Sequence, residues 1–115
     1  MTRRIEKINS LIRDLAGEFF LEKIKARNTI VSAVRAETSS DLREVLLFIA
    51  VFPEKEENVI MKLLKEHKNE WQRFLASNFK AKFLPSTVFL IDKGEKSARR
   101  VEELLARQPS DKTAI

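Results

Sequence analysis

The sequence predicts an α+β fold in which helices cover one face of a three-stranded mixed sheet. Two patterns lead to this class: apolar residues at helical spacing in three segments, and β-branched or apolar runs bounded by turns in three others. Their order along the chain is helix, strand, strand, helix, strand, helix. With 115 residues, the chain is long enough for a single core. We expect one domain over residues 1–108 and a disordered polar tail over residues 109–115.

The first helix is expected over about residues 3–25. Its apolar stripe consists of Ile5, Ile8, Leu11, Ile12, Leu15, Phe19, Phe20 and Ile24. Gly17 lies within this segment, where glycine costs a helix roughly 1 kcal/mol relative to alanine. We therefore expect another backbone to pack closely against Gly17.

A β-hairpin is expected next, because residues 29–37 and 42–52 are β-rich and flank the polar turn 38–41. The apolar centre of the second strand predicts burial on both faces. A third strand is expected over residues 86–92. Because a helix separates it from the second strand, a right-handed crossover would set these two strands parallel.

Pro53 ends the second strand, and the acidic residues that follow suit the beginning of a helix. The apolar stripe then runs to Phe79 in steps of three and four without a phase slip. Periodicity alone therefore predicts one continuous helix. A short final helix is expected over residues 97–107.

Several classes of protein are disfavoured by what the sequence lacks. It contains no cysteine, which excludes disulfides and thiolate chemistry, and its two glycines belong to no phosphate-binding loop. The longest apolar run, residues 45–52, is too short to cross a bilayer as a helix, and the first residues have no apolar signal core. We expect a cytoplasmic protein with no membrane partner.

His67 is the only histidine, and it falls on the apolar stripe of its helix. A buried, hydrogen-bonded side chain is expected there, since no second histidine or cysteine can complete a transition-metal site. A triad of His67 with Ser39 or Ser40 and Asp41 would lack a nucleophile elbow. The sequence therefore predicts no catalytic residue, no metal, no cofactor and no small-molecule substrate.

The formal net charge of +5 comes entirely from the second half of the chain. Residues 62–82 carry six cations against two anions. On a helical wheel, Lys62, Lys65, Asn69, Arg73 and Lys80 fall within about 80° of one another, opposite the apolar stripe, with Lys68 to one side. A solvated charged face is the ordinary interpretation of such a pattern, but this excess of cations favours contact with nucleic-acid phosphates.

Further candidates come from the ends of the first helix, where fewer acidic residues oppose the cations than in its middle. The complete predicted RNA-binding set is Lys62, Lys65, Lys68, Asn69, Arg73, Lys80, Lys82, Arg3, Arg4 and Arg27. Among the aromatic residues, Trp71, Phe74, Phe19 and Phe20 are expected in the core. Phe79 and Phe83 flank lysines and are candidates for stacking on bases.

The segments together resemble the ribosome-binding factor A family from about Arg3 to Leu105. The residues that carry the resemblance are Thr29 to Val34, the turn Ser40-Asp41-Leu42, Pro85 with Phe89 and Asp92, and Arg100 to Leu105. The resemblance implies a KH-like fold of the second type, in which the long helix is kinked at a small residue, here around His67-Lys68-Asn69. Asn69 stands where the family has glycine, and asparagine tolerates positive φ.

The resemblance also implies a non-enzymatic, monomeric factor that binds the small ribosomal subunit and its rRNA and assists late rRNA maturation. The chain departs from the family pattern after the first helix, where Lys25 to Asn28 replace Asp-Pro-Arg, and at Gln72, which replaces an arginine. Two alternatives stay open: a KH-like or ferredoxin-like module that binds protein, and a small basic DNA-binding protein, although no helix-turn-helix spacing is evident.

Overall fold

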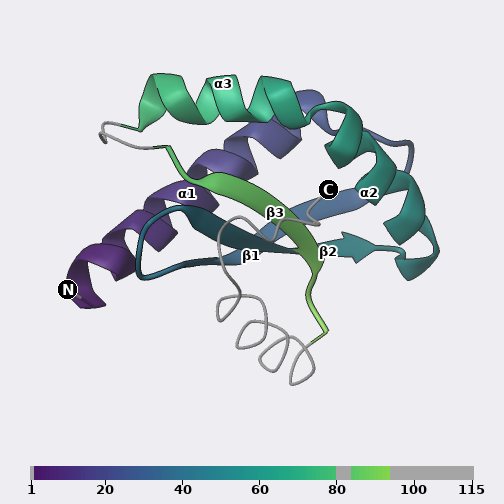
Figure 1. Ribbon diagram of the computed structural model, residues 1–115. Helices are drawn as coiled ribbons and strands as arrows, with labels where there is room; N and C mark the ends of the chain where they lie inside the picture. The colour runs from purple at the N-terminus through teal and green to yellow at the C-terminus, as the bar shows by residue number, and fades with distance from the viewer. Residues whose placement is uncertain (1, 80–83, 94–115) are drawn as a thin grey trace.

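The computed structural model describes residues 2–79 and 84–93. The elements are α1 (Thr2–Lys23), β1 (Ile30–Thr38), β2 (Glu44–Phe52), the 3-10 helix η1 (Glu54–Glu56), α2 (Glu57–Glu66), α3 (Lys68–Asn78) and β3 (Ser86–Ile91). Figure 1 shows α1 and α3 on one side of the sheet. The α+β class and the predicted order of these elements are confirmed. The final helix over 97–107 and the tail over 109–115 lie outside the described residues.

The sheet has the order β1-β2-β3. β1 and β2 form the predicted antiparallel hairpin, with Ile30 opposite Phe52 and Thr38 opposite Val45. β2 and β3 are parallel, with Leu47 opposite Phe89. The crossover prediction is therefore confirmed. Within the hairpin the register shifts between Ala33 and Arg35, which marks a bulge on β1.

The centre of β2 is buried on both faces, as its unbroken apolar sequence predicts. Its odd-numbered side chains, such as Leu47, join a large cluster with residues of α1, α2 and α3. Its even-numbered ones, Leu46 and Phe48, form a second cluster with Val88 and Leu90 of β3 on the opposite face. The guanidinium of Arg35 lies 4.0 Å from the centroid of the Phe48 ring. This central strand therefore ties the two faces of the domain together.

The continuous helix that periodicity alone predicts after Pro53 is wrong, and the kink that the family resemblance implies around residues 67–69 is confirmed. The chain leaves helical geometry at His67, where φ is −99° and ψ is 12°, so that α2 and α3 are separate helices. Figure 1 shows the change of direction between them. The apolar stripe nevertheless faces the core on both helices, since its members are buried: Ile60, Leu64, Trp71 and Leu75.

The expected close approach at Gly17 is also wrong. A Cβ atom built at this position meets no heavy atom within 4 Å, and α1 continues through it. Positive φ occurs at Asn28 and Leu42 instead, the two non-glycine residues of this kind in the described chain. Asn28 follows α1, where asparagine's tolerance of the left-handed region suits it to the turn into β1. Asn69, for which a positive φ was considered, is an ordinary residue of α3.

A candidate nucleic-acid interface at the helix break

The inner side of α3 is anchored to β3 by polar contacts as well as by packing. The fully buried Trp71 donates its indole N–H to Thr87 Oγ1 at 2.9 Å. Gln72 accepts a hydrogen bond from the backbone N–H of Thr87 at 3.2 Å and donates one to the carbonyl of Pro85 at 3.3 Å. Gln72 therefore fixes α3 on the start of β3, and the outer side of the helix faces solvent.

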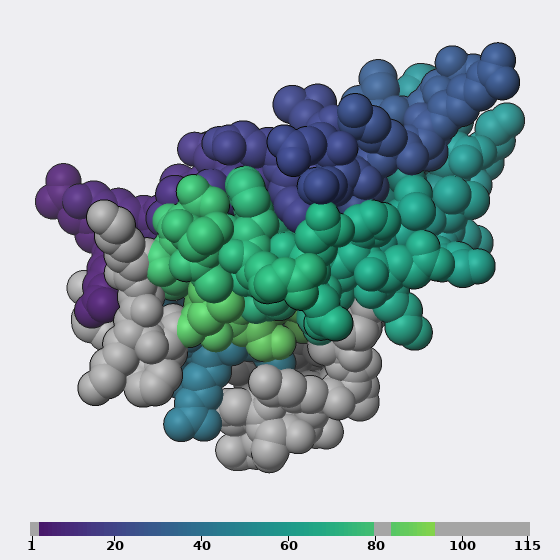
Figure 2. Space-filling view, turned by 90° about the horizontal axis from the view of Figure 1, so that it is seen from above, coloured from purple at the N-terminus to yellow at the C-terminus, as the bar shows by residue number. Residues whose placement is uncertain are grey.

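α3 is also joined to α1. The Phe19 ring of α1 lies 5.5 Å from Trp71 and 5.6 Å from Phe74, measured between ring centroids. Lys23, the last residue of α1, forms an ion pair with Glu70 in the first turn of α3 at 3.1 Å. In the view of Figure 2 these two helices lie side by side across the top of the molecule. The C-terminal end of α1 is thus held beside the helix break.

The candidate cations of α2 and α3 lie on both sides of this break. Lys62, Lys65 and Arg73 are exposed, as is Asn69, whereas Lys68 is half-buried. Lys62 and Lys65 are three residues apart on α2, and Asn69 and Arg73 four apart on α3, so each pair shares one side of its helix. Across residues 2–79 and 84–93, Lys62, Lys65 and Arg73 have no ion-pair partner. Their charges are therefore available to a ligand.

A single helical wheel does not describe this surface. The non-helical backbone at His67 changes the phase between α2 and α3, so the 80° arc predicted for one helix does not hold across it. α3 ends at Asn78 and Phe79 is extended, so helical phase cannot place Lys80. Lys80 and Lys82, together with the stacking candidate Phe83, lie outside the described residues. Phe79, the other stacking candidate, is buried in the core, so that part of the prediction is wrong.

The secondary candidates Arg3, Arg4 and Arg27 are exposed but do not lie together. Arg3 and Arg4 are in the first turn of α1, and Arg27 lies in the loop after it. A helix of this length spans about 30 Å, so the two groups are at opposite ends of it. Arg27 follows the end of α1 that the Lys23–Glu70 ion pair joins to α3, whereas Arg3 and Arg4 lie at the far end of this helix.

His67 lies at the break itself and is less buried than the apolar stripe suggested, with 30% of its side chain exposed. Its Nδ1 donates a hydrogen bond to the carbonyl of Leu63 at 2.9 Å, because a carbonyl oxygen can only accept. Its Nε2 is 4.0 Å from Glu70. The ring thus caps the end of α2. Ser39 donates to Asp41 in the β1–β2 turn, so these residues have partners of their own, and no triad with His67 is formed.

Sequence reasoning missed one exposed aromatic residue. Phe52 is 70% exposed at the end of β2, opposite Ile30, which is 65% exposed. Alternation along β2 could have revealed it. Ala50 and Phe52 lie on the same face of the strand as Phe48, but pairing with β3 ends at Ile49, so β3 does not cover them.

In the described part of the chain no group of acidic and histidine residues could hold a metal ion, and none of the helices there combines the length and apolar character that a membrane span requires.

The fold and this surface define a class of protein: a KH-like α+β domain of the second type, with a broken helix that carries exposed cations on both arms. The sequence profile of ribosome-binding factor A matches residues 4–105. The chain belongs to the ribosome-binding factor A family.

Individual relatives agree with this assignment. The chain is 26% identical over 104 residues to ribosome-binding factor A of Thermodesulfovibrio yellowstonii, covering 90% of this chain and 88% of that protein. It is 29% identical over 108 residues to the protein of the same name from Prochlorococcus marinus, covering 90% and 88%. The crystal structure of ribosome-binding factor A from Thermus thermophilus superposes with a TM-score of 0.63 at 14% identity, covering 76% of this chain and 94% of that one.

Proposed function

We propose that this protein is a ribosome assembly factor that binds the small ribosomal subunit through its rRNA and assists late rRNA maturation without catalysing a reaction. Membership of the ribosome-binding factor A family supports a ribosomal partner. The observation that favours rRNA as the contacted component is the set of exposed cations on the two arms of the helix break, Lys62 and Lys65 on one and Arg73 on the other, which have no ion-pair partner among the described residues.

The physical argument is counterion release. Lysine and arginine side chains that neutralise phosphates displace condensed cations from RNA, so binding weakens as salt concentration rises. Each phosphate contact contributes about 0.7 to 0.9 to the slope of log affinity against log salt concentration. The three unpaired cations would therefore contribute a slope of about 2 to 3.

Co-sedimentation with purified small subunits at several salt concentrations tests this proposal. The double charge reversal Lys65→Glu with Arg73→Glu is expected to weaken binding strongly and to reduce the salt slope by about 2. Lys55→Glu is the matched control, because Lys55 is an exposed lysine of η1 outside the proposed surface. This control is expected to retain nearly all of the binding and the original slope.

Three results would contradict the proposal. Retention of large subunits in preference to small ones would exclude the partner. Unchanged binding by the Lys65 and Arg73 double variant would favour a protein-interaction module, which does not require these cations. Efficient competition by duplex DNA against small subunits would favour a general DNA-binding protein.

A further inference from the structure

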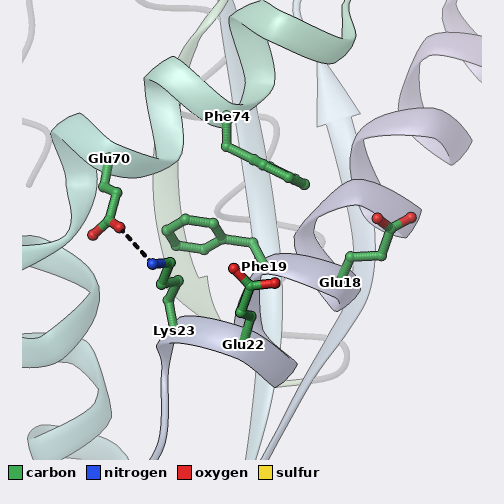
Figure 3. A pocket seen from close by; sticks show the side chains of 6 residues that line it. All are labelled: Glu18, Phe19, Glu22, Lys23, Glu70 and Phe74. Atoms are coloured by element: carbon green, nitrogen blue, oxygen red, sulfur yellow. Dashed lines mark ion pairs between the residues drawn. The ribbon is translucent and has the colours of Figure 1, made fainter.

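A small pocket lies between α1 and α3, with a volume of about 150 Å³. It is lined by Glu18, Phe19, Glu22 and Lys23 of α1 and by Glu70 and Phe74 of α3. Figure 3 shows the two phenyl rings between the helices and Lys23 reaching across to Glu70. Most of the lining is apolar, and the carboxylates are spaced around it. The proposed rRNA surface shares none of these residues.

The charge of this pocket is opposite to that of the protein as a whole. Three carboxylates and one ammonium line it, in a chain whose formal net charge is +5. Lys23 pairs with Glu70 at 3.1 Å. Glu18 and Glu22 have neither an ion pair nor a side-chain hydrogen bond to any residue of the described chain. Phosphate would be repelled here and a cation attracted.

The aromatic part of the pocket is the partly buried Phe74 ring, which packs on the buried Phe19 ring. The Phe19 and Phe74 rings have centroids 5.6 Å apart and planes inclined by 40°. A cation that approaches within about 6 Å of such a ring is attracted by its quadrupole. Lys23 shows that an ammonium group is already held at one edge of the pocket. Phenyl rings provide no metal ligands, which agrees with the absence of a metal-binding group among the described residues.

We propose that this pocket receives the side chain of an arginine from a segment of a partner protein. A planar guanidinium can stack on a phenyl ring while its N–H groups donate to carboxylates, and it is more weakly hydrated than an ammonium. This combination matches a pocket in which the partly buried Phe74 ring lies beside two exposed carboxylates, Glu18 and Glu22, that have no partner among the described residues. The inference does not depend on the proposed rRNA contact, because the ligand is a cation of a protein and the residues are different.

Titration of the ¹⁵N-labelled full chain with the blocked peptide acetyl-Gly-Arg-Gly-amide, followed by NMR, tests this inference. Saturable shifts are expected at the backbone amides of Glu18, Glu22 and Glu70. The same peptide with citrulline, which has the shape of arginine without its charge, should produce none. The peptide with lysine should bind several-fold more weakly, since an ammonium cannot stack as a planar group.

Variants assign the effect to the pocket. Glu18→Gln combined with Glu22→Gln is expected to weaken arginine-peptide binding about tenfold. Glu6→Gln is the matched control, because Glu6 is exposed on the same helix about 18 Å away. It should leave binding unchanged. Lys23→Gln should strengthen binding, since it removes the cation that competes for Glu70.

The inference is overturned if the pocket amides do not shift, if citrulline shifts them as strongly as arginine, or if the Glu18 and Glu22 double variant binds like the unaltered protein. Equal binding of the lysine peptide would contradict the choice of arginine. Because the probe contains no RNA, each of these failures leaves the rRNA proposal standing. Conversely, loss of the salt-dependent subunit binding would leave the arginine pocket intact.

Discussion

Two helical segments of comparable length behave in opposite ways. α1 contains a glycine and runs without interruption from Thr2 to Lys23, whereas the segment from Glu57 to Asn78 contains no glycine and breaks at His67. α1 packs along β1, while α2 contacts β2 and β3 and α3 contacts α1. Helix continuity in this protein therefore depends more on the surfaces that a segment packs against than on the helix propensity of a single residue.

The largest loss of stability is expected when the buried contact between α3 and β3 is removed. Trp71→Phe removes a fully buried indole and its hydrogen bond to Thr87, and should lower the free energy of unfolding by about 2 to 3 kcal/mol. Urea unfolding measures this loss. Thr87→Val, which removes only the acceptor, should cost about 1 to 2 kcal/mol. If both variants were neutral, the anchor could not be what holds α3 at its angle.

A smaller effect is expected at the break itself. His67→Ala removes the ring's hydrogen bond to the Leu63 carbonyl and should lower the free energy of unfolding by about 1 kcal/mol. The break should nevertheless remain, because each helix keeps its own contacts: α2 packs on β2 and β3, and α3 packs on α1 and is hydrogen-bonded to the start of β3. The ¹³Cα chemical shift of residue 67 reports its backbone conformation. A fully helical shift in the variant would assign the break to histidine and remove the packing explanation.

A substitution at Gly17 should raise the free energy of unfolding rather than lower it. A Cβ at this position meets open space, so Gly17→Ala should raise the free energy of unfolding by about 0.5 to 1 kcal/mol through helix propensity. Thermal or urea unfolding checks this gain. A destabilised variant would mean that the glycine has a packing role that the described contacts do not contain.

The smallest effect is expected in the β1–β2 turn, where local hydrogen bonds rather than long-range packing hold the chain. Hydrogen bonds from the Ser39 hydroxyl and from the backbone N–H of Arg43 lower the pKa of Asp41 below its ordinary value of 3.8. A depressed folded-state pKa adds stability that is fully present above the ordinary pKa and is lost as pH falls through the folded-state pKa.

Asp41→Asn should therefore cost about 0.5 kcal/mol at neutral pH, a small value because the carboxylate is exposed. The stability difference from the unaltered protein should shrink below about pH 4. Unfolding curves at pH 7 and at pH 3 measure it. Ser39→Ala, which removes the strongest hydrogen bond to the carboxylate, should weaken the same pH dependence. A difference that stays constant across this range would show that the aspartate does not titrate with a lowered pKa.

The candidate interface was predictable in part. The cations of α2 and α3 were found from charge and periodicity, and the structure places Lys62, Lys65 and Arg73 in solvent. The family resemblance implied a kink around residues 67–69, but the arrangement of the cations across it was not predictable from periodicity, because the apolar stripe has the same spacing whether the helix continues or bends. Phe79 was misassigned for a similar reason: flanking charge suggested exposure, but the chain becomes extended there and turns the ring into the core.

Periodicity, turn chemistry and the handedness of crossovers are enough to predict the α+β class, the hairpin, the parallel third strand and the burial of β2 on both faces. The structure was needed to show that the helix breaks at His67 rather than at Asn69, that Gly17 faces open space, and that Glu18, Glu22 and Glu70 line one pocket. The spacing of apolar residues predicts which side of a helix or strand faces the core. It does not predict the angle at which two elements meet, and that angle determines which side chains from distant segments become neighbours.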